Sequence, residues 1–391
     1  MCRKKSIPAI FLDGTNGNMK LCCVFNTAPH YRREIYNQIE KTFACGWAFG
    51  KKALGGGDIE VMSPSAFQEF LGYLENRRIV GNWYWQKGTL PLLFKKFDTY
   101  LVLGEPFCIS TWVFCALAKL VPGKRVFFWT HGWYGRETLV KRIMKKIFFR
   151  LGNGIFLYGN YARELMIKEG FSPEKLWTIH NSLAYDEQLK LRNSLKPSNI
   201  FRKHFGNKNS TLSFVGRLTE TKRLDMVLDA MATLRERGLN LNLVLIGDGV
   251  ARERLGVKVQ VLGLEKNVWF YGACYDEDKI SELLYNADLC VSPGNIGLTA
   301  MHALMFGCPC LTHDDFKNQM PEFEAISPGK TGAFFKRGDV KSLANSIEKW
   351  FSENRSREDI RAACYAEIDT SWNPAYQIEV LKKGLLSYRN A

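Results

Sequence analysis

Residues 287–312 alternate apolar runs with a turn and a helix, which is the strongest constraint on the fold. Residues 287–291 predict a short buried strand, and residues 298–306 predict a helix ending at Gly307, a position suited to positive φ. A second apolar run follows at 310–312. A tight turn leading into a helix leaves backbone N–H groups pointing outward at the positive end of the helix dipole. Taken alone, this turn fits an ordinary α/β sheet and a phosphate site equally well.

The whole chain shows the same alternation, in two halves. With 391 residues, 46% of them hydrophobic, it is too long for one ordinary core, so two α/β domains are expected. A polar stretch at 191–210 predicts the linker between them, and the tail from Trp372 is expected to be helical. In the first half, strands are predicted at 20–25, 99–103, 125–129, 154–158 and 176–179, and helices at 31–42, 107–120, 136–151 and 160–169.

Positive charge is concentrated in the first half. Residues 1–200 hold 29 Lys and Arg against 15 Asp and Glu, which accounts for nearly all of the net charge of +15. Such an imbalance suggests an anionic ligand or surface. Nucleic-acid binding would call for exposed aromatic residues interleaved with the cations, whereas the Trp and Phe residues fall mostly in predicted core strands.

The cysteines and the N-terminus indicate the compartment. Eleven cysteines, with neither a CxxC pair nor a zinc-binding spacing, favour a reducing, cytoplasmic setting. No apolar run is long enough to cross a bilayer. Residues 1–18 do not resemble a secretory signal and are expected to be an unstructured extension.

Four sequence blocks carry a family resemblance. In order, they are Val215 to Leu218 followed by Lys222, then Ile246 to Gly249, then Ser292 to Pro309, then Pro321 and Glu322 followed by Thr331 and Gly332. Together they resemble the donor half of retaining GT-B glycosyltransferases of family 4, over roughly residues 209–350. The resemblance implies two facing Rossmann-like domains with a cleft between them and a last helix that crosses back to the first domain. The expected boundaries are 1–18 for the extension, 19–195 and 209–368 for the domains, and 369–391 for the crossing helix.

The resemblance assigns the donor site. Arg217 and Lys222 match the positions that bind the donor diphosphate, where cations stabilise the charge of the departing phosphate. His131 follows a predicted strand and matches a histidine near the transferred sugar, where we expect it to make a polar contact and not to act as a base. The expected donor-binding residues are Asn295, Gly297, Leu298, Thr299, His302 and Glu322.

The chain departs from the family pattern at two positions. The family's two glutamates, eight residues apart, fall on Gly294 and His302. The first normally holds sugar hydroxyls and the second holds the ribose. His302 can still bond a ribose or can simply pack beneath the turn, and Asn295 can replace one sugar contact. The departure leaves the donor, and the activity itself, open.

Acceptor-side candidates lie in loops after the first-domain strands. These are His30, Tyr31, Arg32 and Glu105. The acidic segments 276–278 and 314–315 resemble metal-binding carboxylates, but they lie at expected helix starts or in loops, where acidic residues are common. The resemblance implies no bound metal and no cofactor.

Residues 136–150 combine an apolar face (Leu139, Ile143, Ile147 and Phe148) with Lys and Arg. This pattern fits a helix on an anionic membrane surface as well as a solvated basic face on a packed helix. Because the family often uses lipid-linked acceptors, we favour the membrane.

The sequence therefore predicts a cytoplasmic, metal-independent, retaining glycosyltransferase, and we expect it at the inner face of the cell membrane. Its expected partners are a nucleotide diphosphate sugar and a lipid-linked glycan acceptor, in polysaccharide or glycan biosynthesis. Two alternatives stay open. One is a GT-B nucleotide-sugar epimerase, which would need acid/base carboxylates in the cleft. The other is a GT-B subunit that has lost catalysis and binds or scaffolds.

Overall fold

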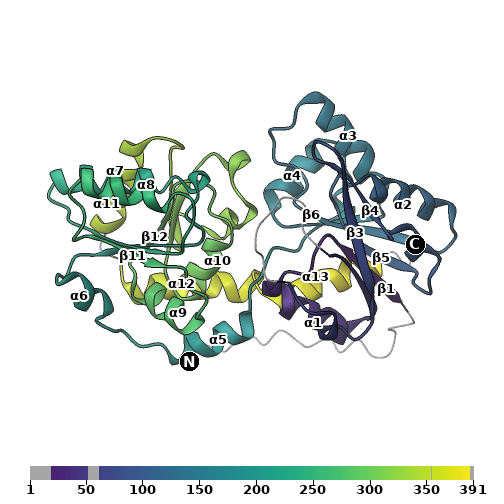
Figure 1. Ribbon diagram of the computed structural model, residues 1–391, viewed down its shortest axis with the longest axis horizontal. Helices are drawn as coiled ribbons and strands as arrows, with labels where there is room; N and C mark the ends of the chain where they lie inside the picture. Colours follow the sequence, from purple (N-terminus) through teal and green to yellow (C-terminus); the bar gives the residue numbers. More distant parts are fainter. Residues whose placement is uncertain (1–18, 52–60, 354, 388–391) are drawn as a thin grey trace, which may run out of the picture.

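The computed structural model describes residues 19–51, 61–353 and 355–387, and the predicted extension at 1–18 lies outside them. The chain forms two α/β domains side by side, each built on its own sheet (Figure 1). The predicted two-domain GT-B architecture is confirmed. None of the helices in these ranges combines the length and apolar character that a membrane span requires.

The N-terminal sheet has eight strands in the order β4-β3-β2-β1-β5-β6-β7-β8. Neighbouring strands run parallel, except that β3 and β4 form an antiparallel hairpin at one edge. Helices cover both faces, so the central strands are continuous apolar runs. The strands are β1 (Lys20–Phe25), β2 (Ala44–Gly50), β3 (Phe70–Val80), β4 (Trp83–Lys87), β5 (Thr99–Leu103), β6 (Arg125–Thr130), β7 (Gly154–Leu157) and β8 (Leu176–Thr178).

Four helices of this domain match the predicted ones. They are α1 (Arg33–Thr42), α2 (Ile109–Leu120), α3 (Leu139–Phe149) and α4 (Asn160–Lys168). Helix α1 packs on one face of the sheet, and α2, α3 and α4 pack on the other. The sequence did not predict β2, β3 or β4.

The C-terminal sheet has six parallel strands in the order β11-β10-β9-β12-β13-β14. One face is covered by α7, α8 and α11, and the other by α9, α10 and α12 (Figure 1). Gly307, just after α10, has φ 74°, as predicted. The strands are β9 (Thr211–Val215), β10 (Asn242–Ile246), β11 (Val268–Gly272), β12 (Leu289–Ser292), β13 (Cys310–His313) and β14 (Gly332–Phe335). The helices are α7 (Asp225–Glu236), α8 (Arg252–Val261), α9 (Glu277–Asn286), α10 (Leu298–Met305), α11 (Val340–Ser352) and α12 (Arg357–Ser371).

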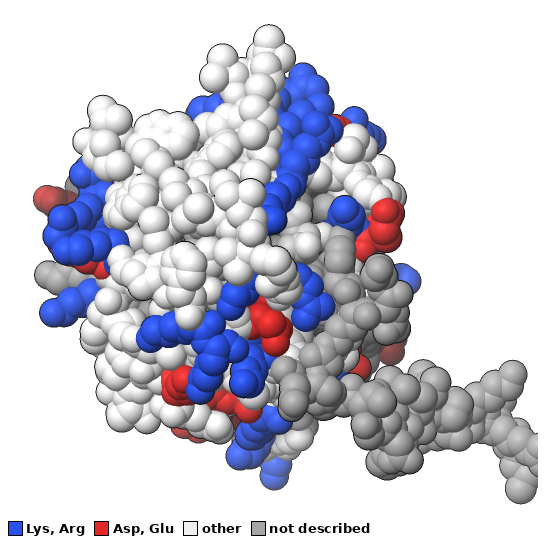
Figure 2. All heavy atoms as spheres, turned by 90° about the vertical axis from the view of Figure 1, so that its right-hand side faces the viewer, with Lys and Arg blue, Asp and Glu red and all other residues white. Residues whose placement is uncertain are grey.

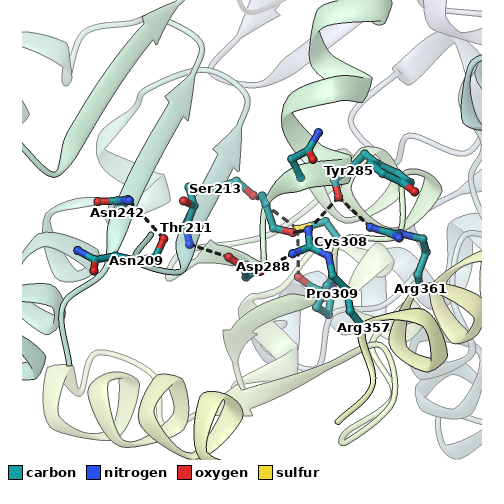
Figure 3. Close-up of polar contacts among 12 residues, drawn as sticks. Asn209, Thr211, Ser213, Asn242, Tyr285, Asp288, Cys308, Pro309, Arg357 and Arg361 are labelled. Atoms are coloured by element: carbon teal, nitrogen blue, oxygen red, sulfur yellow. Dashed lines mark hydrogen bonds and ion pairs between the residues drawn. The ribbon is translucent and has the colours of Figure 1, made fainter. Parts of the chain in front are cut away.

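A polar network fastens the amino ends of β9 and β12 to α12 (Figure 3). The Asp288 carboxylate accepts the backbone N–H of Thr211 at 2.7 Å and pairs with Arg357. Arg357 and Arg361 also donate to the carbonyl of Tyr285 at 2.9 and 3.0 Å. These contacts lie at the opposite end of the sheet from the carboxyl ends of the strands, where ligands bind in such folds.

The stretch at 191–210, predicted to be the linker between the domains, is part of the C-terminal domain instead. It holds the end of α5 (Tyr185–Ser194) and all of α6 (Ile200–Phe205), and both helices pack against the C-terminal domain. Apolar residues such as Leu191 and Phe201 are interspersed among the polar ones, and they pack against the hydrophobic core of the C-terminal domain. The chain therefore changes domain earlier, between β8 and α5.

The last helix, α13 (Pro374–Leu386), crosses back and packs against α1, as predicted. It runs past the point where the chain first changes domain. Gln377 donates to the carbonyl of His180 at 3.0 Å and accepts from Ser182 at 2.7 Å, and the His180 and Trp372 rings lie 4.1 Å apart. The segment that leaves the N-terminal domain after β8 therefore contacts the segment that returns to it through α13.

Candidate functional site

The two loops predicted to hold the donor diphosphate meet at the carboxyl ends of β9 and β12. The ammonium of Lys222 donates to the backbone oxygen of Asn295 at 2.6 Å and to its side-chain oxygen at 2.9 Å. In return, the N–H of Gly294 donates to the carbonyl of Lys222 at 2.9 Å. Lys222 closes the 3-10 helix η5 (Glu220–Lys222), so the turn after β9 and the turn after β12 form one unit.

Lys222 is the cation of this unit whose pKa is shifted. Its partial burial lowers its pKa to about 8, with the nearby Arg217 contributing and Glu322 acting in the opposite direction. Arg217 lies exposed, two residues beyond β9. Two cations at one strand end, one of them partly desolvated, make a site that favours an anion.

Gly294 has no room for a side chain. A Cβ there would lie 1.9 Å from the carbonyl oxygen of Thr221 and 2.8 Å from the Cα of Lys222, both of them backbone atoms. The carboxylate that the related family carries at this position therefore cannot be accommodated. Asn295, the next residue, offers its side-chain oxygen to Lys222 instead.

The turn into α10 supplies backbone groups. Gly297 precedes the helix at φ 56° and ψ −147°, and Leu298 is the first helical residue. The hydroxyl of Thr299 donates to the carbonyl of Val215 at 2.8 Å, which ties α10 to β9. The side chain of Thr299 is thus occupied, and its contribution to a donor would come from its backbone N–H.

His302 lies one turn further along α10, against neighbouring helices. Its Nδ1 is 4.0 Å from a carboxylate oxygen of Glu277 and 3.5 Å from the amide nitrogen of Gln188. Burial lowers the pKa of His302, while Glu277 opposes the shift. The ring is partly exposed and lies among residues of α5 and α9.

Glu322 is a buried carboxylate at the domain boundary. Its side chain is 2% exposed, and Oε1 accepts a hydrogen bond from Asn181 of the crossing segment at 3.0 Å. Oε2 is buried with no partner among the described residues. Burial raises the pKa of Glu322, although Asn181, Lys222 and Arg32 act against the rise. The carboxylate therefore lies near cations of both domains.

On the N-terminal side, Arg32 and His131 surround Tyr158. Arg32 donates to the Tyr158 hydroxyl, and its guanidinium lies 5.3 Å from the ring centroids of both Tyr158 and Trp129. The His131 ring is 4.6 Å from that of Tyr158. Burial, together with Arg32 and Lys145, lowers the pKa of His131 to about 4, so the ring is neutral at pH 7. Arg32 Nε and His131 Nδ1 are buried without partners among the described residues.

Of the remaining acceptor-side candidates, His30 and Tyr31 adjoin Arg32 in the chain, and Glu105 lies in a separate loop. His30 and Tyr31 precede Arg32 in one 3-10 helix, and Tyr31 packs against the core of the C-terminal domain. Glu105 follows β5 and accepts the N–H of Phe107 at 3.2 Å, and its burial raises its pKa. Tyr31 therefore belongs to the domain boundary, whereas Glu105 is held by its own loop.

The acidic segments make local contacts. Asp276 caps α9 by accepting from the N–H groups of Asp278 and Lys279. Asp315 pairs with Arg337 at 2.9 Å and accepts from Asn318. These carboxylates are engaged as helix caps and ion pairs.

Three residues at the domain boundary were not among the predicted site residues: Tyr158, Asn181 and Glu324. Signals for two of them were present, because Tyr158 follows β7 and Asn181 follows β8 at the ligand-binding edge of the sheet. Glu324 reaches the other domain and accepts from the N–H groups of Asn160 and Tyr161. Its partner is 163 residues away in the chain, and nothing local indicates it.

Comparisons with known proteins agree with this architecture. The sequence profile of the family Glycosyl transferases group 1 matches residues 196–366. Among curated proteins, a putative glycosyltransferase EpsD of Bacillus subtilis is 25% identical over 44% of this chain and 45% of its own length. Mannosylfructose-phosphate synthase of Agrobacterium fabrum is 28% identical over 44% of this chain and 39% of its own. The match thus spans less than half the length of these relatives.

Solved structures match over nearly the whole chain. HepE of Anabaena, solved in complex with UDP, superimposes with a TM-score of 0.71 at 16% identity, covering 95% of this chain and all of HepE. The lipopolysaccharide outer core galactosyltransferase WaaB in its apo form gives 0.69 at 15% identity, with the same coverage. At these identities the likeness shows the fold. The chain has the GT-B fold, and its residues 196–366 are similar to the family Glycosyl transferases group 1.

Proposed function

We propose that this protein is a retaining glycosyltransferase that moves a sugar from a nucleotide diphosphate donor to a glycan acceptor. The observation that carries the proposal is Lys222, a partly desolvated cation that joins the two strand-end turns of the glycosyl transferases group 1 domain. The UDP bound by HepE, which shares the fold, supports a nucleotide donor.

The proposed mechanism uses the residues around the cleft. As the bond between the sugar and the diphosphate breaks, Lys222 and Arg217 stabilise the charge that develops on the departing phosphate. The acceptor hydroxyl forms the new bond on the same face of the sugar and passes its proton to that phosphate. Neutral His131 offers a polar contact to the sugar. No step in this scheme requires a bound metal or a cofactor.

Thermal stabilisation by nucleotides tests the proposal. The purified protein is heated with UDP, GDP, dTDP and their common sugars, beside the double variant Arg217→Ala/Lys222→Ala. We expect one nucleotide to raise the melting temperature of the wild type by several degrees and to leave the double variant unchanged, because binding to the folded state alone stabilises it. Lys330→Ala, at an exposed lysine of the same domain, should respond like the wild type.

The main alternative is a subunit that has lost catalysis. Two observations favour this alternative. Gly294 has no space for the family's carboxylate, and His302 lies beside Glu277. Failure of every nucleotide to stabilise the wild type would refute the transferase and leave this binding or scaffold role.

For the acceptor, we propose a lipid-linked glycan reached from the cytoplasmic face of a membrane, with α3 as the contact. Leu139, Val140, Ile143 and Ile147 are between 51% and 76% exposed. The predicted apolar face differs in one member, because Phe148 points into the core. Figure 2, which views the N-terminal domain end on, shows groups of Lys and Arg beside broad uncharged areas.

The basic residues of α3 divide into two sets. Lys145 pairs with the buried Glu137 at 2.7 Å, and Arg142 and Lys146 pair with Glu169. Lys141 and Arg150 are exposed. The helix therefore presents exposed aliphatic side chains with cations beside them, as interfacial helices do.

Vesicle sedimentation tests the membrane contact. The protein should sediment with vesicles containing phosphatidylglycerol more than with neutral vesicles, and Val140→Glu/Ile143→Glu should lower the bound fraction at least about tenfold, because buried apolar area and charge attraction are both lost. The matched control is Val257→Glu/Val261→Glu, which places two glutamates at exposed valines of α8 in the other domain. Equal binding by both double variants would refute a contact through α3.

A further inference from the structure

One short segment of the C-terminal domain reaches the other domain at three points. Asn318 accepts a hydrogen bond from Arg136 at 2.6 Å, Glu322 accepts from Asn181, and Glu324 accepts from the start of α4. Glu322 and Glu324 both belong to the 3-10 helix η7 (Pro321–Ala325). The two glutamates are separated by one residue, and each accepts hydrogen bonds from a different segment.

Glu324 caps a helix of the opposite domain. Its Oε2 accepts the N–H of Asn160 at 2.6 Å, and its Oε1 accepts the N–H of Tyr161 at 2.7 Å. The first N–H groups of a helix have no partner within the helix, and the helix dipole favours a negative charge there. Gly159, the residue before α4, has no side chain to cap it, so the N-terminal domain leaves this end of α4 to Glu324.

Gly159 is fitted to this carboxylate. Its backbone is extended, at φ −153° and ψ 155°, which any residue can adopt. A Cβ at this position would nevertheless lie 2.4 Å from Oε1 of Glu324. The space beside the glycine is therefore filled by the Glu324 carboxylate of the other domain, and a larger residue would displace that carboxylate from the start of α4.

The contact lies next to the residues proposed for transfer. On one side Gly159 follows Tyr158, whose hydroxyl accepts from Arg32 and whose ring lies 4.6 Å from that of His131. On the other side Glu324 is two residues from Glu322, whose Oε2 is buried and unpartnered among the described residues. Joining the two segments fixes the distance between the N-terminal and C-terminal halves of the site.

We propose that Glu324 is a positioning residue, which holds the two domains closed so that Glu322 and Lys222 face Arg32 and His131 across the cleft. Its role in transfer rests on the proposed function, whereas its role in closure does not. Two charge-assisted hydrogen bonds at a water-accessible boundary are strong enough to favour the closed state and weak enough to break for substrate entry and product release.

Small-angle X-ray scattering tests closure without any substrate. Glu324→Ala and Gly159→Ala alter the same contact from opposite domains, and each should increase the radius of gyration relative to the wild type. The double variant should open no further than either single one, because both remove one interaction. Glu164→Gln, an exposed glutamate on α4, is the control and should scatter like the wild type. An unchanged radius of gyration in both single variants would overturn the proposal.

Kinetics then test the positioning role. With the nucleotide sugar that stabilises the protein, both single variants should lower kcat about tenfold or more, as expected when a charge-assisted contact is lost from the reactive state. The Kd of the free nucleotide should stay within about threefold, since Lys222 and Asn295 belong to one domain. Glu324→Asp should recover part of the rate.

The two failures can be told apart. Loss of nucleotide affinity in step with kcat would show that Glu324 acts merely on the stability of its domain, and would reject positioning. If none of UDP, GDP and dTDP binds the wild type, the proposed function fails, while scattering still decides whether Glu324 holds the domains together.

Discussion

Replacing Lys222 by methionine is expected to lower release of the nucleoside diphosphate from its sugar donor by about a hundredfold to a thousandfold, the usual cost of removing one preorganised group that stabilises developing charge. The methionine keeps most of the side-chain volume and removes the ammonium. Two effects add, because the cation proposed to face the diphosphate is lost and the bonds to Asn295 at 2.6 and 2.9 Å disappear. The nucleotide Kd should rise as well.

The same lysine should impose a pH dependence. Burial lowers the pKa of Lys222 to about 8, so its ammonium is present at pH 7 and is lost as the pH rises past 8. An anionic diphosphate binds the protonated form, so nucleotide affinity in the wild type should fall between pH 7 and pH 9. Isothermal titration calorimetry at both values measures this. In Lys222→Met the dependence should be absent.

Lys330→Met is the matched control, because this lysine is exposed in the same domain. It should keep the activity, the affinity and the pH profile of the wild type. Should Lys222→Met retain more than about half of the wild-type rate, electrostatic stabilisation by this residue would be rejected.

The sequence predicted most of the strands that are buried on both faces, although it missed β2, in which only Ala44 is exposed. Strand β6 is an unbroken apolar run covered by helices on both sides, so its pattern reflects its surroundings. The β3–β4 hairpin carries Glu75, Arg77 and Arg78 on a largely exposed strand, and no periodic pattern marks it. It is held by tertiary contacts, among them Gln86 donating to the carbonyl of Phe25 at 3.2 Å. Such contacts are not visible in a local pattern.

The site divides in a similar way. Lys222 and Asn295 lie 73 residues apart, yet both follow parallel strands, and the ends of such strands meet at one edge of a sheet. Their proximity could therefore be anticipated. The partner of Glu324 could not, because a helix start usually takes its cap from the residue just before it, and here the cap comes from the other domain. Contacts that form only when two domains meet leave no local signal.

Gly294→Ala is expected to be among the most destabilising single substitutions in the C-terminal domain. A Cβ would lie 1.9 Å from the carbonyl oxygen of Thr221 and 2.8 Å from the Cα of Lys222. Both are backbone atoms, so no side chain can turn aside to make room. The turn after β12 would have to separate from η5, which breaks the hydrogen bond from the Gly294 N–H to Lys222. We expect a loss of about 3 kcal/mol or more in the free energy of unfolding.

The same displacement should remove nucleotide binding, because it pulls Asn295 away from Lys222. Restoring the family's residue with Gly294→Glu should therefore also abolish binding. Gly256→Ala is the matched control: this glycine lies within α8, and the nearest atom to its Cβ is a guanidinium nitrogen of Arg252 at 3.8 Å. Alanine there should stabilise the domain by up to about 1 kcal/mol through its helix propensity.

Urea unfolding of the three proteins, followed by tryptophan fluorescence, measures both effects. If Gly294→Ala were as stable as the wild type and bound nucleotide equally well, the turn would have to adopt another path, one with space for a side chain at position 294. The family's carboxylate could then be accommodated, and its absence here would reflect substrate choice. If the loss is as large as expected, the glycine is required by the close approach of two backbones. The donor sugar would then have to be held by groups outside that position, and the Glu322 carboxylate, which raises the pKa of Lys222 and whose Oε2 has no partner among the described residues, is the candidate that the structure offers.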